Sequence, residues 1–310
     1  MGDTLMQFTR RQFTKLSIGS GAALALGPVP ALADENLMLK AIPASGEKIP
    51  VIGVGTNRYG VGNDAEKRAA LREALAKFHE LGGTVVDTAP MYGSSEPVLG
   101  ELIASLGIRD DLFMATKVDV DGTSQQAARM EQSFSRLKYR KVDLMQCHNL
   151  VDWQNAIPVM REWQQEGRVR YVGITSSRER QYEEMEQIMK KHDLDFIQIN
   201  YSLADQRLSD QRLLPLAADR GMAVLVNRPF GGGDVFGKLQ KTSIPDWAQA
   251  FGAESWAQFL LKYAISHPAV TAAIPGMTKA RHVSDNMRAG LGRLPTPAER
   301  QRQEAFFDAL

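Results

Sequence analysis

The sequence has little of three things: cysteine, excess charge of one sign, and long apolar runs. Cys147 is the single cysteine among 310 residues, so no intrachain disulfide can form and packing must hold the fold. The 37 Lys and Arg residues nearly balance the 36 Asp and Glu residues. Residues 1–33 carry a net charge of +2, which leaves −1 for the rest of the chain. The protein therefore offers no basic surface for nucleic acid and no polybasic membrane patch.

The composition is otherwise that of an ordinary globular protein. Hydrophobic residues make up 44% of the chain and charged residues 24%. These proportions provide enough apolar side chains for a large core, and they exclude a disordered chain, a collagen-like repeat and a coiled coil.

The first 33 residues have the features of an export signal. Arg10 and Arg11 precede Phe13 and a weakly apolar run over residues 16–29, and Ala31-Leu32-Ala33 offers small residues to a signal peptidase. The run is too short and too rich in glycine to remain as a membrane anchor. This segment resembles a twin-arginine (Tat) signal, which implies a partner in the Tat export machinery, cleavage after Ala33 and a periplasmic protein. A basic, disordered N-terminal arm is the alternative.

Short β-branched runs alternate with helical patterns after residue 34. Eight runs begin at intervals of 27 to 33 residues, with a last interval of 48, and they cover residues 51–56, 84–88, 112–117, 142–147, 169–174, 196–201, 223–228 and 271–275. Such an interval fits a strand, a crossover helix and two short loops. We therefore expect residues 34–310 to form one α/β domain, a (β/α)8 TIM barrel. No long exposed apolar stripe demands an oligomer, so we expect a monomer.

The segments between the runs predict outer helices. Leu71, Leu75, Phe78 and Leu81 share one helical face after Asp64, a suitable N-cap, and before the glycine pair at 82–83. The last interval contains three consecutive glycines at 231–233, so we expect an extended surface loop there.

Polar residues follow three neighbouring strand runs, at the end where such barrels carry their chemistry. Asp87 ends the second run and is followed by Tyr92, Lys117 ends the third, and His148 follows the fourth. A buried lysine needs a nearby carboxylate, which Asp87 provides. A lysine beside a tyrosine favours the phenolate, so we expect Lys117 to lower the pKa of Tyr92. Tyr92 could then exchange a proton while His148 aligns a substrate carbonyl.

These motifs resemble the aldo-keto reductase superfamily from about residue 49 to residue 286. The most specific stretch is Val86-Asp87-Thr88-Ala89-Pro90-Met91-Tyr92-Gly93, followed by segments 115–117, 143–148, 173–176 and 274–286. The resemblance implies a (β/α)8 barrel, bound NADP(H), and reversible reduction of a small carbonyl substrate. It also implies that Asp87, Tyr92, Lys117 and His148 form the catalytic tetrad.

The same resemblance assigns the cofactor contacts. It implies that Thr175, Ser176 and Gln198 hold the nicotinamide carboxamide, and that the glycine-rich start of the barrel lets the backbone approach the cofactor. The full set of implied cofactor residues is Gly55, Thr56, Asn57, Asp87, Thr175, Ser176, Gln198, Asn227, Arg228, Pro229, Gly231, Ile274, Gly276, Met277, Thr278, Lys279, Arg281, His282, Asp285 and Asn286.

The cofactor region departs from the family pattern at several positions. Asn227 stands where the family usually has an aromatic residue that stacks on the nicotinamide, and Arg228 beside it could contact phosphate. Gly276 and Met277 replace the Lys-Ser pair that grips the 2′-phosphate in many members. Lys279 and Arg281 could supply that charge, so NADP(H) is favoured over NAD(H), which stays possible.

A short C-terminal tail predicts an open substrate pocket walled by Arg58, Tyr59 and Trp153, although Trp153 could equally be a packed loop residue. Other barrel enzymes fit poorly. A glycosidase needs paired carboxylates at the mouth, and a metal hydrolase needs convergent ligands, whereas the remaining histidines fall in helical segments. We expect Cys147 to pack in the barrel wall. The alternative from another class is a cofactor-binding barrel that senses or binds a partner with little turnover.

Overall fold

The computed structural model describes residues 36–204 and 207–310, so the predicted export signal at 1–33 lies outside the described residues. The strands run β1 (Leu39–Ala41), β2 (Lys48–Pro50), β3 (Val54–Gly55), β4 (Val85–Asp87), β5 (Phe113–Val118), β6 (Val142–His148), β7 (Val169–Ser176), β8 (Phe196–Asn200), β9 (Ala223–Asn227) and β10 (Ala272–Ala273). The helices are α1 (Ala65–Glu80), α2 (Ser95–Leu106), α3 (Thr123–Leu137), α4 (Trp153–Gln165), α5 (Tyr182–Lys191), α6 (Leu213–Asp219), α7 (Val235–Leu239), α8 (Trp256–Ser266), α9 (Ala280–Arg288) and α10 (Pro297–Asp308).

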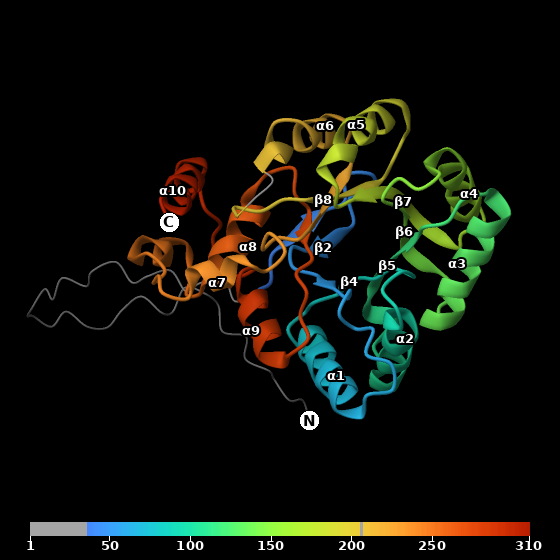
Figure 1. The fold of residues 1–310 in the computed structure, drawn as a ribbon, viewed down its shortest axis with the longest axis horizontal. Helices are drawn as coiled ribbons and strands as arrows, with labels where there is room; N and C mark the ends of the chain where they lie inside the picture. The colour runs from blue at the N-terminus through green and yellow to red at the C-terminus, as the bar shows by residue number, and fades with distance from the viewer. Residues whose placement is uncertain (1–35, 205–206) are drawn as a thin grey trace, which may run out of the picture. The chain divides into compact units, whose positions relative to one another are not determined.

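The strands β3 to β10 form one parallel sheet in sequence order, ringed by helices (Figure 1). Two parallel bridges, Ile52 with Ala273 and Gly55 with Gly276, join the first and last strands. The sheet therefore closes on itself, and the predicted (β/α)8 barrel is confirmed. Each of the eight predicted runs contains or overlaps one of these strands.

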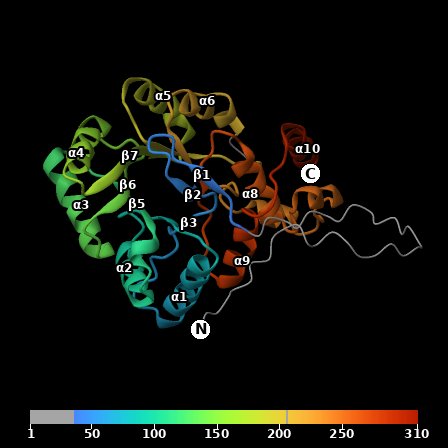
Figure 2. The same ribbon diagram turned by 180° about the vertical axis from the view of Figure 1, so that it is seen from behind.

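The hairpin of β1 and β2 was not predicted from the sequence. Figure 2 shows it from behind the barrel. Its Ile42 and Ile49 belong to the same buried cluster as Phe113, Tyr171 and Phe196, which come from the N-terminal parts of barrel strands. The hairpin thus closes the end of the barrel opposite the strand C-termini.

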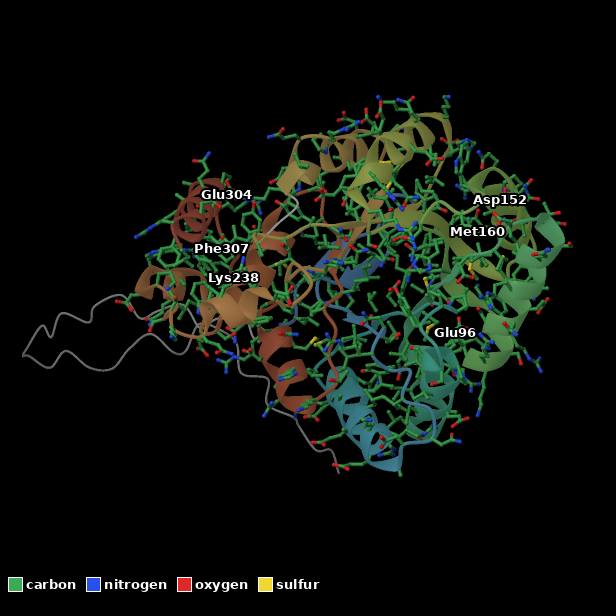
Figure 3. The ribbon with its side chains drawn as sticks, viewed as in Figure 1. Glu96, Asp152, Met160, Lys238, Glu304 and Phe307 are labelled. Carbon is green, nitrogen blue, oxygen red and sulfur yellow. The ribbon has the colours of Figure 1, made fainter. Side chains whose placement is uncertain are left out.

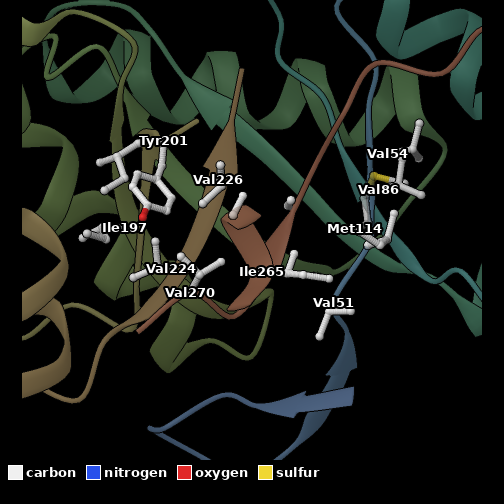
Figure 4. Packing of buried hydrophobic residues seen from close by; sticks show 14 of the residues in the cluster. Val51, Val54, Val86, Met114, Ile197, Tyr201, Val224, Val226, Ile265 and Val270 are labelled. Atoms are coloured by element: carbon white, nitrogen blue, oxygen red, sulfur yellow. The ribbon is translucent and has the colours of Figure 1, made fainter. Parts of the chain in front are cut away.

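The sheet has two buried faces, as a barrel requires. The inner face carries residues such as Leu144, Phe196 and Leu225. The outer face packs on the helices, and Figure 4 shows part of that cluster, including Val224 on β9 and Ile265 on α8. Because side chains alternate along a strand, this assignment turns Lys117, Gln146, His148, Gln198 and Asn227 toward the barrel interior.

The structure confirms the helix predicted between Asp64 and the glycine pair at 82–83, which is α1. Asp64 is its N-cap and accepts a hydrogen bond from the Lys67 N–H at 3.0 Å, and Leu71, Leu75 and Phe78 are buried. Leu81, predicted on the same face, is instead the C-cap and is exposed because the helix ends before it.

The expected long surface loop after Gly233 contains a short helix, α7, and a 3-10 helix, Asp246–Phe251.

Among residues 36–204 and 207–310, no helix is both long enough and apolar enough to cross a bilayer. Within the same residues, no group of three or more His, Cys, Asp or Glu side chains converges in a way that could hold a metal ion.

Candidate active site at the barrel mouth

A buried ion pair joins the ends of β4 and β5. Lys117 Nζ donates to both carboxylate oxygens of Asp87, each at 2.7 Å, and to the Thr88 carbonyl at 2.7 Å. Lys117 is 1% exposed and Asp87 2%. The three ammonium hydrogens are therefore engaged within the protein, which fixes the lysine charge at the centre of the mouth.

Two amides complete the surroundings of Asp87. Gln146 Nε2 on β6 donates to one carboxylate oxygen at 3.3 Å, and Gln198 Nε2 on β8 donates to the other at 3.4 Å. The role of Gln146 was missed from the sequence, although its position two residues before His148 places it on the same inward face. Asp87 is thus held from three other strands.

The charges of this pair oppose the cost of burial. Burial raises the pKa of Asp87, and the Lys117 charge and the two amides partly offset that effect. Burial alone would lower the pKa of Lys117, but the combined attraction to Asp87, Tyr92 and Glu96 outweighs it and the pKa of Lys117 is raised. Lys117 therefore stays a cation across the neutral range.

Tyr92 lies beside this pair. Its ring centroid is 5.4 Å from Lys117 Nζ and 6.0 Å from the His148 ring, which meets it edge-on at 89°. A hydrogen bond from the Tyr92 N–H to the Ala89 carbonyl, 3.1 Å long, forms the turn that brings the ring back over the strand end. The structure therefore brings together all four residues predicted as the tetrad.

The expected effect on Tyr92 is wrong in its net direction. Burial raises the pKa of Tyr92 and outweighs the Lys117 charge, which lowers it. Desolvation depends on the burial of the ring, which cannot be read from the residues at one strand end. Tyr92 therefore stays protonated in this state and can donate a hydrogen bond.

His148 is a neutral imidazole at this site. Burial, followed by the charges of Lys117 and Arg178, lowers the pKa of His148 to about 3. Its Nδ1 is buried and has no hydrogen-bond partner among the described residues. The neutral ring can donate one hydrogen bond to a carbonyl oxygen without adding a second cation beside Lys117.

The turn after His148 has unusual backbone geometry. Asn149, Leu150 and Asp152 have φ of 52°, 56° and 45°, a region that residues other than glycine rarely adopt. Asp152 Oδ2 holds the turn by accepting from the Gly122 N–H at 2.7 Å and from Gln126 Nε2 at 3.0 Å. Figure 3 labels Asp152 at the start of α4 and Glu96 on α2.

Glu96 is another buried acid that was missed from the sequence. It is 1% exposed, accepts from the Thr116 hydroxyl at 2.8 Å, and has its pKa raised by burial. Thr116 is on the outward face of β5, directly before Lys117. Glu96 thus supports the strand end that carries Lys117.

The predicted cofactor residues divide into four groups, of which the first faces the mouth. Thr175, Gln198 and Asn227 point inward at the ends of β7, β8 and β9. The side-chain oxygens of Gln198, Asn227 and the neighbouring Asn200 are buried and have no partner among the described residues. Buried acceptors without partners fit a ligand that brings hydrogen-bond donors, such as a carboxamide.

The second group is already engaged within the protein. The Thr56 hydroxyl donates to the Asp87 carbonyl, the Ser176 hydroxyl to Gln181, and the carboxylate of Asp285 accepts from Ser255 and Gln258. The side chains of Ile274, Met277 and Asn286 are buried. These side chains do not join the polar cluster at the mouth.

Free cations lie along the rim on the β9–β10–β3 side. Arg58, Arg228 and Lys279 are exposed, and none of them pairs with a carboxylate of the described residues. A cavity of about 250 Å³ joins Arg58 to the start of α9 and is lined by Arg58, Val61, Lys67, Ala70, Leu71, Thr278 and Lys279. Arg281 and His282 are exposed in the first turn of α9. This arc of positive charge fits the phosphates of a dinucleotide.

The remaining predicted positions lie on the loops around this arc. Asn57 and Gly276 are exposed on the loops after β3 and β10, and Gly55 and Thr278 are half-buried beside them. Pro229 is buried and Gly231 half-buried after β9. Open backbone at these loops leaves room for a ligand to approach.

The structure corrects one of the three predicted pocket walls, Tyr59, and favours the packing alternative for Trp153. Tyr59 is 1% exposed and donates its hydroxyl to the Met277 carbonyl at 2.9 Å, so it supports the loop after β10 from inside. The Trp153 indole donates to Glu184 at 2.9 Å and packs on His192, so it joins α4 to α5. Arg58 is exposed at the rim. Cys147 is buried in the barrel wall, as expected.

Comparison with known proteins agrees with this geometry. Residues 51–298 match the family model described as the aldo/keto reductase family. The methylglyoxal reductase YeaE of Escherichia coli is 29% identical over 256 residues, which cover 80% of this chain and 88% of that protein. The L-galactose dehydrogenase of Arabidopsis thaliana is 26% identical over 291 residues, or 82% of this chain and 88% of that protein.

Solved structures show the same fold. An aldo/keto reductase of Klebsiella pneumoniae, crystallised in complex with NADP and acetate, superposes with a TM-score of 0.72 at 27% identity and covers 84% of this chain and 93% of that chain. The family-model match over residues 51–298 includes Asp87, Tyr92, Lys117 and His148. The chain described here therefore belongs to the aldo/keto reductase family of oxidoreductases.

Proposed function

We propose that this protein is an NADPH-dependent reductase of small aldehydes or ketones, with Tyr92 as the general acid. The observation that carries the proposal is the assembly of Tyr92, the Lys117–Asp87 pair and neutral His148 at one barrel mouth. Proton donation to an oxygen is what this arrangement can do chemically. A bound reduced nicotinamide would supply the hydride that the side chains cannot supply.

The residues present fit such a cofactor. Gln198, Asn200 and Asn227 offer unpaired acceptors at the mouth, and Arg58, Arg228 and Lys279 offer unpaired positive charge along one side of the rim. The family's solved members bound to NADP support the same choice. Lys279 and Arg281, at the start of α9, favour the phosphorylated form of the cofactor, while NAD(H) is the alternative.

The catalytic roles follow from the geometry. Tyr92 donates its hydroxyl proton to the carbonyl oxygen as negative charge develops there, and His148 donates a hydrogen bond to the same oxygen. The Lys117 cation stabilises the phenolate that remains. Asp87, with Gln146 and Gln198, holds that cation in place.

Export through the twin-arginine pathway is part of the proposal. The arginine pair and the small residues before residue 34 support cleavage after Ala33 and a periplasmic location. N-terminal sequencing of the protein from the periplasm tests this: a chain that starts at Asp34 supports it, and an intact Met1 there contradicts it.

Turnover with added cofactor tests the catalytic proposal. The mature protein is titrated with NADPH and with NADH, and a generic aldehyde is then supplied in excess. We expect NADPH to bind more tightly and the aldehyde to be reduced through many cycles. Binding without turnover, or reduction that stops after one equivalent, would support a sensing or partner-binding barrel instead.

A further inference from the structure

The loop after β7 is tied to the ends of the strands on either side of β7. The Ser177 carbonyl accepts a hydrogen bond from Asn200 Nδ2 at the end of β8, at 2.9 Å. On the other side, Gln181 Nε2 donates to the Asn149 carbonyl, at 2.7 Å, directly after His148. Residues 177–181 are therefore tied to β8 at one end and to the His148 turn at the other.

Arg178 lies between these two anchors on a fixed backbone. Its N–H donates to the Ser176 hydroxyl at 3.0 Å, and its carbonyl accepts from the Gln181 N–H at 2.9 Å. The Ser176 hydroxyl in turn donates to Gln181 Oε1 at 2.6 Å. This network explains why Ser176 faces the loop and not the barrel interior.

The Arg178 side chain is exposed, and no carboxylate among residues 36–204 and 207–310 pairs with it. Its charge nevertheless contributes to lowering the pKa of His148. The hydrogen bond from Gln181 to the Asn149 carbonyl ties the loop that carries Arg178 to the turn directly after His148. The mouth thus has a free cation beside the group that aligns the carbonyl.

Arg178 is separated from the other free cations of the rim. Arg58, Arg228 and Lys279 follow β3, β9 and β10, which are adjacent in the barrel, whereas Arg178 follows β7. The charge on the β9–β10–β3 arc fits the cofactor phosphates without Arg178. A single guanidinium matches the two oxygens and the single charge of a carboxylate.

We propose that the substrate is a small aldehyde or ketone that carries a carboxylate, and that Arg178 binds this carboxylate while His148 and Tyr92 contact the carbonyl. The inference rests on the proposed reductase function and adds the chemical class of its substrate. Arg178 then determines the preference of the enzyme for acidic over neutral carbonyl substrates.

Matched pairs of aldehydes test the proposal in the mature protein with NADPH. Succinic semialdehyde is compared with butanal, and para-carboxybenzaldehyde with para-tolualdehyde, by kcat/KM at low and high salt. The variants are Arg178→Gln and, as a matched control, Arg180→Gln, which removes an exposed arginine two residues along. Circular dichroism confirms that each variant is folded.

We expect the wild-type protein to favour the acidic aldehyde of each pair at low salt and to lose much of that preference at high salt. Arg178→Gln should lower kcat/KM for the acidic aldehydes about tenfold more than for the neutral ones, the usual effect of one hydrogen bond to a charged group. Arg180→Gln should change neither.

Equal preference in the wild-type protein, or an unchanged ratio in Arg178→Gln, overturns the substrate assignment and leaves the reductase function standing. If none of the four aldehydes is reduced by the wild-type protein although NADPH binds, the reductase function fails, and the substrate assignment fails with it.

Discussion

Lys117 Nζ lies 2.7 Å from both carboxylate oxygens of Asp87, so the two charges meet symmetrically inside the barrel mouth. Neither side chain has appreciable contact with solvent. Removing one member would leave the other charged, buried and without its main partner. This lowers the free energy of unfolding far more than replacing both members by uncharged residues.

The first prediction concerns the stability of this pair. Lys117→Met should lower the free energy of unfolding by about 3–5 kcal/mol, because it leaves the Asp87 carboxylate uncompensated. The double variant Lys117→Met/Asp87→Asn should recover part of that loss. Urea denaturation measures both, and a single variant that stays within about 1 kcal/mol of wild type would argue against a fully ionised pair.

The second prediction concerns the general acid. Tyr92→Phe keeps the ring and removes the hydroxyl, so kcat for aldehyde reduction should fall by about 10²–10⁴-fold. NADPH affinity and the free energy of unfolding should change little, since the phenylalanine keeps the ring and its contacts with Lys117 and His148. A rate within twofold of wild type would remove Tyr92 from the mechanism.

The third prediction uses the lowered pKa of His148. The folded state lowers the pKa of His148 from 6.5 to about 3, so between these values the unfolded chain binds the proton more readily. The contribution of the neutral, buried His148 ring to the free energy of unfolding is therefore complete above pH 6.5 and is lost as the pH falls toward 3. As the pH falls from 7 to 5, the free energy of unfolding of His148→Gln should therefore decrease less than that of the wild-type protein. The difference should reach up to about 2 kcal/mol.

Denaturation at a series of pH values measures this difference. His267, whose pKa burial lowers to about 4, adds a similar slope in both proteins and cancels in the comparison. Parallel curves for the two proteins would mean that His148 titrates alike in the folded and unfolded states.

The fourth prediction concerns the strained turn after His148. Asp152→Ala removes the acceptor of the Gly122 N–H and of Gln126, and should lower stability by about 1–3 kcal/mol. It should also lower kcat, because the left-handed backbone at Asn149 and Leu150 loses its support. Asp152→Asn keeps one side-chain oxygen as acceptor and should restore most of both quantities. An alanine variant with normal kcat would separate the turn from catalysis.

The sequence predicted the barrel because strands and helices repeat at a regular interval. The positions of Asp87, Lys117 and His148 at the ends of three strand runs also placed them at one rim, since parallel strand ends in a barrel meet there. The burial of individual side chains could not be predicted from the sequence. The raised pKa of Tyr92, the buried position of Tyr59 and the engagement of Ser176 and Asp285 all depend on neighbours from distant parts of the chain.

The roles of Gln146 and Glu96 were missed because they also depend on contacts between distant parts of the chain. Gln146 and Glu96 contact Asp87 and Thr116 on other elements of the fold. The two-residue spacing from His148 was a local signal for Gln146, whereas no local pattern distinguishes Glu96 from an ordinary helix residue. The β1–β2 hairpin was missed because its two short strands fall before the repeating interval begins. The monomeric state and the export signal stay predictions.

The most direct test of the account is isotope transfer. NADPH carrying deuterium at the transferable position is supplied with an aldehyde, and the alcohol product is examined by mass spectrometry. The account predicts one deuterium on the carbinol carbon of each product molecule, over many turnovers per protein and with little product from Tyr92→Phe. Failure to bind NADPH, or product without deuterium, would contradict hydride transfer at this site.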